Sequence, residues 1–332
     1  MGEKRKTVSF LRHFYDPFSI IWYDRGNDDR GGNMMLKIEH LAKHFGDLEA
    51  LHDINFQVAD GEILGLIGQN GAGKSTTFHS ILNFLSYEGT ISWNDQTINE
   101  TVFDQIGYLP EERSLMPKLT VEQQILYLAQ LKGQPARKIK GEIDDWLQRF
   151  EVKGKRTDKI RALSKGNQQK IQLICTLIHR PSLIILDEPF SGLDPVNVDL
   201  LEQAILTAKQ QGAAIIFSSH DMGNVEALCD ELVMLRHGNM VLHGEIRDIR
   251  EQFGKSEIFV TTDWSQADLL QLDHVIDLKQ LSRRRFMLRV DDPAAGQPIF
   301  QQLSGGHYIE EFSQQPPTLD EIFRLKAGDG HA

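Results

Sequence analysis

The stretch ILGLIGQNGAGKSTT, residues 63–77, decides the fold of this 332-residue chain. Residues 68–75 match the pattern GxxxxGK[ST] directly after an apolar run that is typical of a buried strand. Glycines let the backbone curl so that successive N–H groups face one centre, and a helix beginning near Lys74 adds its positive dipole end. Lys74 itself brings a positive charge to the β- and γ-phosphates of a nucleotide. A chance glycine-rich turn would not combine strand, lysine and serine, so the stretch predicts a phosphate-binding loop for ATP. The predicted contacting residues are Gly68, Gln69, Asn70, Gly71, Ala72, Gly73, Lys74, Ser75 and Thr76.

Two carboxylates follow a second apolar run, LIIL at residues 183–186. Asp187 at the strand tip suits Mg²⁺, as does the hydroxyl of Ser75, and Glu188 can polarise a water that attacks the γ-phosphate. An Asp-Glu pair alone is more often a solvated strand end, but beside a phosphate loop the pair indicates ATP hydrolysis. His220 ends a third apolar run, AAIIFSSH, where ligands of open α/β sheets bind. We expect it to orient Glu188 and the water.

The bulk composition is that of a globular protein, with 40% hydrophobic and 25% charged residues. The formal net charge of −11 argues against a nucleic-acid binder, because such proteins neutralise phosphates with Lys and Arg. Cys175 and Cys229 form no CxxC pair, which predicts free thiols and no zinc site. No run approaches the roughly 18–20 apolar residues that cross a bilayer. We interpret residues 1–33 as a flexible N-terminal extension without a signal-peptide cleavage site.

Apolar runs alternate with helical patterns over residues 34–244, which predicts an α/β domain built on a largely parallel sheet. After Gly244 the pattern becomes strand, helix, two strands, helix, strand and a closing helix. The order β-α-β-β-α-β is that of ferredoxin-like domains. The sequence therefore predicts a smaller α+β C-terminal domain over residues 245–332. This domain either regulates the larger domain or supports its dimer, or it is only a stabilising appendage.

The motifs taken in order resemble the ATP-binding cassette (ABC) family over residues 36–244. They are the phosphate loop, LSKGN at 163–167, LDEP at 186–189, SGLDP at 191–195 and the strand-end histidine. The LSGGQ-like segment makes the resemblance specific, because it separates this family from other phosphate-loop ATPases. The resemblance implies a mixed sheet with a helical subdomain, and two cassettes stacked head to tail around ATP. It implies that Ser164, Lys165, Gly166 and Asn167 face the ATP of the partner cassette. It further implies that Asp194 lies at the dimer seam and that Phe45 stacks on adenine.

This sequence departs from the family pattern at two places. LSGGQ is LSKGN here, so Lys165 and Asn167 replace a glycine and a glutamine. A side chain at residue 165 limits the approach of the backbone to phosphate, although its positive charge is favourable. In IGYLPE, residues 106–111, Glu111 stands where the family has glutamine. We expect Glu111 to ligate Mg²⁺ and to respond to the membrane partner, while it brings extra negative charge to the triphosphate.

Residues 109–133 and the small C-terminal domain resemble bacterial ABC-2-type export cassettes, including sodium- and drug-efflux-like members. The resemblance implies the ATP-hydrolysing motor subunit of an exporter, with ATP and Mg²⁺ as cofactors. It implies a second, identical cassette and a separate transmembrane permease as partners, with no nucleic acid. The chain then lies at the cytoplasmic face of the membrane, held there by the permease.

Two alternative functions remain open at this stage. A soluble ABC ATPase acting on ribosomes or DNA is disfavoured, because the chain has one phosphate loop and no sustained heptads in the 90 positions from Lys74 to Ser164. A regulatory subunit that binds ATP without hydrolysing it is disfavoured by the intact site residues Lys74, Asp187, Glu188 and His220.

Overall fold

The larger lobe is built on a six-stranded sheet. The computed structural model describes residues 35–112 and 114–327, so the predicted extension at 1–33 lies outside the described residues. The strand order is β10 (Asn239–Glu245), β9 (Glu231–Arg236), β3 (Ile63–Ile67), β8 (Ala214–Ser219), β7 (Leu183–Leu186) and β6 (Ile106–Leu109). Strand β10 pairs antiparallel with β9, and the other neighbouring strands of this sheet pair in parallel. Because β3 and β7 both pair in parallel with β8, the carboxyl ends of these three strands meet at one edge of the sheet.

A second sheet is antiparallel and shares one apolar cluster with the first sheet and with helix α1 (Lys74–Ile81). Its order is β2 (Leu48–Ala59), β1 (Met35–Phe45), β4 (Glu88–Trp93) and β5 (Gln96–Thr97). Leu183 and Ile185 of β7 belong to the apolar cluster between these layers, whereas Ile184 and Leu186 belong to a cluster on the opposite face. Strand β7 is therefore buried on both sides, as its uninterrupted apolar run predicts.

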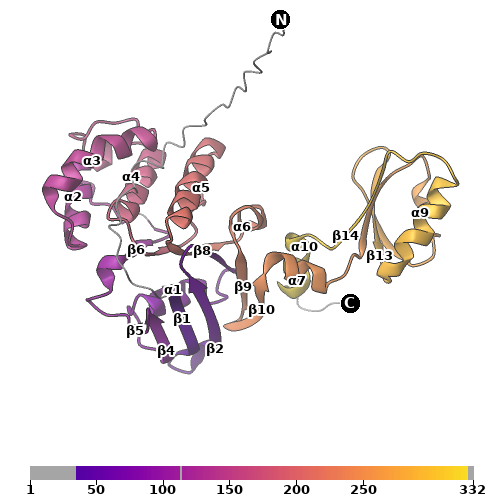
Figure 1. Cartoon of the computed structure of the whole chain (residues 1–332), viewed down its shortest axis with the longest axis horizontal. Helices are drawn as coiled ribbons and strands as arrows, with labels where there is room; N and C mark the ends of the chain where they lie inside the picture. Colours follow the sequence, from indigo (N-terminus) through magenta and orange to yellow (C-terminus); the bar gives the residue numbers. More distant parts are fainter. Residues whose placement is uncertain (1–34, 113, 328–332) are drawn as a thin grey trace, which may run out of the picture.

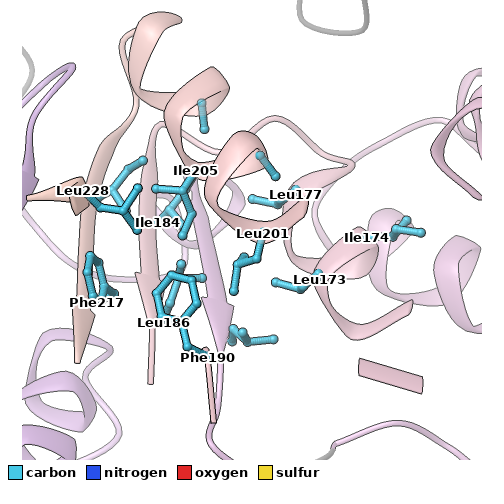
Figure 2. Close-up of a cluster of buried hydrophobic side chains, with 14 of the residues drawn as sticks. Leu173, Ile174, Leu177, Ile184, Leu186, Phe190, Leu201, Ile205, Phe217 and Leu228 are labelled. Carbon is cyan, nitrogen blue, oxygen red and sulfur yellow. The ribbon is translucent and has the colours of Figure 1, made fainter. Parts of the chain in front are cut away.

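Helices supply the opposite face of the six-stranded sheet. They are α2 (Val121–Leu131), α3 (Ala136–Arg149), α4 (Lys165–Leu177), α5 (Pro195–Gln210) and α6 (Met222–Leu228), with the 3₁₀ turn η2 (Ile160–Ala162) (Figure 1). The 3₁₀ turn η1 (Phe103–Gln105) packs instead against the apolar cluster between the two sheets. Figure 2 shows Leu201 and Ile205 of α5 and Leu177 of α4 beside Ile184 and Phe217 of the sheet. Full burial of each such side chain contributes about 1.5–3 kcal/mol.

The C-terminal lobe forms a separate antiparallel sheet. Its order is β12 (Val275–Gln280), β13 (Arg285–Val290), β11 (Glu257–Thr261) and β14 (Glu311–Gln315), and α8 (Gln266–Leu269), η3 (Pro293–Ala295) and α9 (Gly296–Ser304) complete it. Ile258, Leu288 and Ile299 belong to an apolar core of its own. Chain order and strand order together are those of a ferredoxin-like unit, so the predicted fold class is confirmed.

The closing helix lies elsewhere than the sequence suggests. Helix α10 (Leu319–Ala327) leaves the small sheet and packs on α6 and on α7 (Ile246–Gln252) of the larger lobe (Figure 1). Leu319 and Ile322 are fully buried in the same apolar cluster as α5 and α6. An amphipathic pattern predicts a helix but not which core receives its apolar face. The boundaries 34–244 and 245–332 stay a prediction, and α10 shows that the last helix shares the larger core.

Two further sequence-based points concern the described residues alone. None of the helices there is long and apolar enough to cross a membrane. Cys175 and Cys229 are both free thiols, and burial raises the pKa of the Cys175 thiol to about 12.

Candidate active site

The phosphate loop connects β3 to α1, as the sequence predicts. Gly73 has a φ of 113°, and a Cβ placed on it would lie 2.7 Å from Cδ2 of Leu51. Both the backbone conformation and the available space therefore require glycine there. Lys74 is 7% exposed, and its Nζ donates a hydrogen bond to the Gly68 carbonyl at 2.8 Å. The lysine thus folds back across the loop and fixes its curl.

Asp187 follows β7 and is almost fully buried. Ser218 of β8 donates from its Oγ to Oδ1 of Asp187 at 2.7 Å, and this serine Oγ accepts a hydrogen bond from the Glu188 N–H at 2.8 Å. The parallel register, with Leu186 beside Phe217, places the serine level with both acidic residues. Buried polar groups need such partners, because an unpaired one costs about 1–3 kcal/mol. Ser218 therefore orients the acidic pair.

Glu188 adopts a left-handed backbone with φ of 45°, which is uncommon for a residue with a side chain. Its Oε2 lies 2.9 Å from Nδ1 of His220, and its Oε1 lies 3.6 Å from Nζ of Lys74. The histidine and the lysine together hold the carboxylate beside the phosphate loop. Backbone strain of this kind persists where the surroundings fix it, often at functional sites. The geometry suits a group that polarises water next to a phosphate.

A cavity of about 780 Å³ joins these groups. Most of the predicted site residues line it, and its size is in the range of small-ligand sites. Those that line it are Gln69, Asn70, Gly71, Gly73, Lys74, Ser75, Thr76, Glu111, Asp187, Glu188 and His220. The structure therefore brings together the phosphate loop, the acidic pair, the histidine and Glu111.

The oxygen donors in this cavity fit Mg²⁺. Ser75, Asp187 and Glu111 all line it, and hydroxyl and carboxylate oxygens are the ligands that Mg²⁺ prefers. The pKa of the neighbouring Tyr108 phenol is affected by the negative charge of the carboxylates in this cavity. Burial raises the pKa of Tyr108 to about 12, and the carboxylates of Asp187 and Glu111 add to the shift. A bound cation would offset this concentration of negative charge.

The LSGGQ-like segment lies outside the cavity. Ser164 is the N-cap of α4, where its Oγ accepts hydrogen bonds from the N–H of Asn167 at 3.3 Å and from its Nδ2 at 2.8 Å. Lys165 is exposed beside them. Asp194 similarly caps α5 and does not line the cavity. These residues are not brought to the phosphate loop within one chain, and their roles stay predictions.

The predicted adenine-stacking residue, Phe45, also lies outside the cavity lining. It ends β1 with 46% of its surface exposed, and Nζ of Lys43 lies 4.8 Å from the ring centroid. Leu48, Glu49 and Ala50 of the following strand do line the cavity. The stacking role of Phe45 stays a prediction.

Ser218 and Phe323 are site residues that no sequence motif identifies. Ser218 sits in the AAIIFSSH run, one strand from Asp187, and only the pairing of β7 with β8 reveals its contact. Phe323 of α10 lines the same cavity as the phosphate loop. No sequence signal identifies it, because it lies more than a hundred residues from every motif of the site.

A phosphate loop, an acidic pair and a histidine at the ends of adjacent parallel strands define a phosphate-loop nucleoside triphosphatase. Comparison with known proteins narrows this class. Residues 51–191 match the family described as ABC transporter, and residues 244–327 match the C-terminal domain of DrrA1-3-like ATP-binding proteins.

Relatives and solved structures agree with the family match. The uncharacterized ABC transporter ATP-binding protein YhaQ of Bacillus subtilis (strain 168) is 42% identical over 89% of this chain and 99% of its own length. The linearmycin resistance ATP-binding protein LnrL of the same organism is 28% identical over 87% of this chain and 97% of its own length. A solved ATP-binding subunit of an ABC transporter has a TM-score of 0.63 at 33% identity, over 66% of this chain and 93% of that one. The chain belongs to the ABC transporter ATP-binding proteins, which hydrolyse ATP to power transport.

Proposed function

We propose that two copies of this chain close around two Mg·ATP and drive a separate permease in the direction of export. The observation that carries the proposal is a half-built site. Lys74, Asp187, Glu188 and His220 converge on one cavity, whereas the segment that begins at Ser164 lies outside it. The predicted phosphate-binding and hydrolytic groups are therefore present in one chain, and the γ-phosphate contacts implied by the LSKGN segment have to come from another.

The hydrolytic step follows from the contacts of Glu188. The loop N–H groups and Lys74 hold the β- and γ-phosphates, and Ser75 with Asp187 and Glu111 would hold Mg²⁺, which neutralises developing charge. Glu188 accepts a hydrogen bond from the attacking water, and His220, 2.9 Å from its other oxygen, keeps the carboxylate in place. Ser218 keeps the backbone of Glu188 level with Asp187.

Helix α4 links the LSKGN segment to the loop of Glu111. Ser164 caps the start of α4, and Nε2 of Gln172, two turns on, lies 3.4 Å from the Pro110 carbonyl and 3.3 Å from the Glu112 carbonyl. If ATP bound to the partner chain contacts Ser164 and shifts it, helix α4 would move with it. The helix would then move the loop of Glu111, because Gln172 bonds the residues on either side of Glu111. We infer that this connection carries cassette closure to the permease.

The export direction rests on similarity. The relative LnrL is named for resistance to linearmycin, and removing a compound from the cell produces resistance. The similarity to that relative extends over 97% of its length and includes the C-terminal unit of this chain, since it covers 87% of the chain. The permease would hold this chain at the inner face of the membrane, since the described residues contain no membrane-spanning helix of their own.

The test of the nucleotide site is equilibrium binding of Mg·ATP with phosphate release measured on the same samples. Lys74→Ala should lose most of both, because it removes the charge that the loop holds between Gly68 and Glu188. Lys279→Ala, at an exposed position on β12, is the matched control and should match the wild type. No binding by the wild type, or unchanged binding by Lys74→Ala, would refute the assignment.

The test of export uses inside-out vesicles that contain the chain and its permease. ATP added outside such vesicles should drive the transported compound inward, and Glu188→Gln should abolish this uptake. ATP-driven release of a preloaded compound would instead indicate import.

A further inference from the structure

Helix α10 is anchored to the larger lobe by apolar and polar contacts. Leu319 and Ile322 are both fully buried in the cluster that contains Val225 and Leu228 of α6 and Ile249 of α7. Figure 1 shows α10 beside α7, away from the sheet of the small lobe.

Hydrogen bonds fix both ends of this helix. At its start, the Leu319 N–H donates to Oε1 of Glu226 at 3.1 Å. Two residues earlier in the chain, the Pro317 carbonyl accepts a hydrogen bond from Nε of Arg250 at 3.1 Å. At the other end, Nη1 of Arg236 donates to the Lys326 carbonyl at 3.2 Å. Arg236 directly precedes His237 and Gly238, which line the nucleotide cavity. The helix is thus held against the turn that forms one side of the site.

Phe323 lies between these anchors and lines the nucleotide cavity. It is half-buried, one residue after the fully buried Ile322. Apart from glycines, the cavity lining is mostly charged or polar, and its apolar side chains are Leu48, Ala50 and Phe323. Phe323 is the largest of the three and comes from the segment that follows the small lobe.

We propose that Phe323 is a nucleotide-contacting residue, so that the ATP site of this protein is completed by its own C-terminal helix. The ring cannot bond phosphate oxygens, which the loop and Lys74 satisfy. It makes apolar contact with the bound nucleotide and excludes water from that side of the cavity. Exclusion of water strengthens the interaction of the phosphates with Lys74 and the loop N–H groups, because local screening falls.

The contact links nucleotide binding to the C-terminal segment. If docking of α10 on the larger lobe raises the affinity for ATP, then bound ATP must favour the docked position of α10 by the same factor, because the coupling free energy is reciprocal. Glu321, on the same helix, lies 3.7 Å from Arg289 of β13. The small lobe is thereby connected to the nucleotide through one helix.

The experiment compares Mg·ATP dissociation constants for the full-length wild type, Phe323→Ala, Phe323→Leu and Leu325→Ala. Loss of a partly buried ring should raise the constant about tenfold in Phe323→Ala, and the leucine variant should recover part of the loss. Leu325 is 62% exposed on the same helix and does not line the cavity, so its alanine variant should stay within about twofold of the wild type. Wild-type affinity in Phe323→Ala would overturn the inference.

A second measurement needs no variant, in case Phe323→Ala does not fold. Saturating Mg·ATP should slow amide hydrogen exchange over residues 319–327 of the wild type, and unchanged exchange there would overturn the inference. The inference rests on the proposed nucleotide site, and the two fail differently. If the wild type binds no ATP, the proposed function fails, whereas equal binding by wild type and Phe323→Ala removes only the role of Phe323.

Discussion

The two halves of the proposed ATP site differ in how complete they are within one chain. On the phosphate-loop side, Lys74 and Glu188 are at most 10% exposed, and each is already in contact with a second site residue. On the LSKGN side, Ser164 and Asn167 bond each other at the exposed start of α4 and do not line the cavity. The difference teaches that the first half is preorganised by folding. The second half is a helix end with polar groups that can be redirected to a ligand.

The largest effect is expected at the preorganised half. Glu188→Gln keeps the shape of the side chain but removes the negative charge that polarises water, so turnover should fall about 100-fold or more. ATP binding should persist, because Lys74 and the loop are unchanged, and ATP should then trap a dimer visible by light scattering. Phosphate release at the wild-type rate would show that the carboxylate is not the group that acts on water.

The LSKGN half should respond in turnover but not in the affinity of one chain. Ser164→Ala removes a hydroxyl that the proposed dimer directs at the partner's γ-phosphate, and ATPase should fall about 10- to 100-fold. The dissociation constant of Mg·ATP, measured at chain concentrations too low for pairing, should change less than about twofold if the segment lies outside the single-chain site.

Ser164→Thr is the matched control for that prediction. Threonine keeps both the hydroxyl and the N-cap of α4, whose loss costs about 1 kcal/mol of stability. The threonine variant should therefore retain most of the turnover. Equal loss in the two variants would mean that the hydroxyl itself is not what matters.

A smaller effect is expected from Ser218, which supports the acidic pair from behind. Ser218→Ala leaves one oxygen of the buried Asp187 without its 2.7 Å donor and should lower turnover about tenfold and stability by about 1–3 kcal/mol. Ser219→Ala is the control, since that neighbour is equally buried but bonds Asp221 instead. If both variants lost turnover equally, the contact with Asp187 would carry no special role.

The smallest effect concerns pH and the junction between the lobes. Glu257 of β11 is 1% exposed, and burial together with the nearby Glu321 carboxylate raises its pKa from 4.5 to about 7. The folded protein therefore binds this proton more tightly than the unfolded chain does, and its contribution to stability is lost as the pH rises from about 4.5 through about 7. Between pH 5.5 and pH 8, about one to two pH units on either side of this pKa, the melting temperature of Glu257→Gln should fall less than that of the wild type. Parallel melting curves for the two proteins across that range would contradict this assignment.

The parts of the site that the sequence predicts are those written in contiguous residues. The glycines, Lys74 and Ser75 follow one strand, and Asp187 with Glu188 follows another, so local pattern places each at a strand end. The convergence of these strands follows from a parallel sheet, which the apolar runs predict.

What the sequence could not predict depends on pairing between distant segments. The bond from Ser218 to Asp187 requires β8 to lie beside β7 in a particular register. The place of α10 requires a choice between two apolar cores, and nothing in its own residues distinguishes them. Phe45, Asp194 and the LSKGN segment remain predictions, because their proposed partners are adenine and a second chain.

The small lobe is, in space, an insertion between α7 and α10. Residues 253–256 lead out to it and residues 316–318 lead back, so two short chain segments connect it to the larger lobe. A lobe on a single connecting segment can rotate freely, whereas a lobe on two segments rotates mainly about the line that joins their two attachment points. Any force on the small lobe would accordingly act on the end of α7 and on the start of α10.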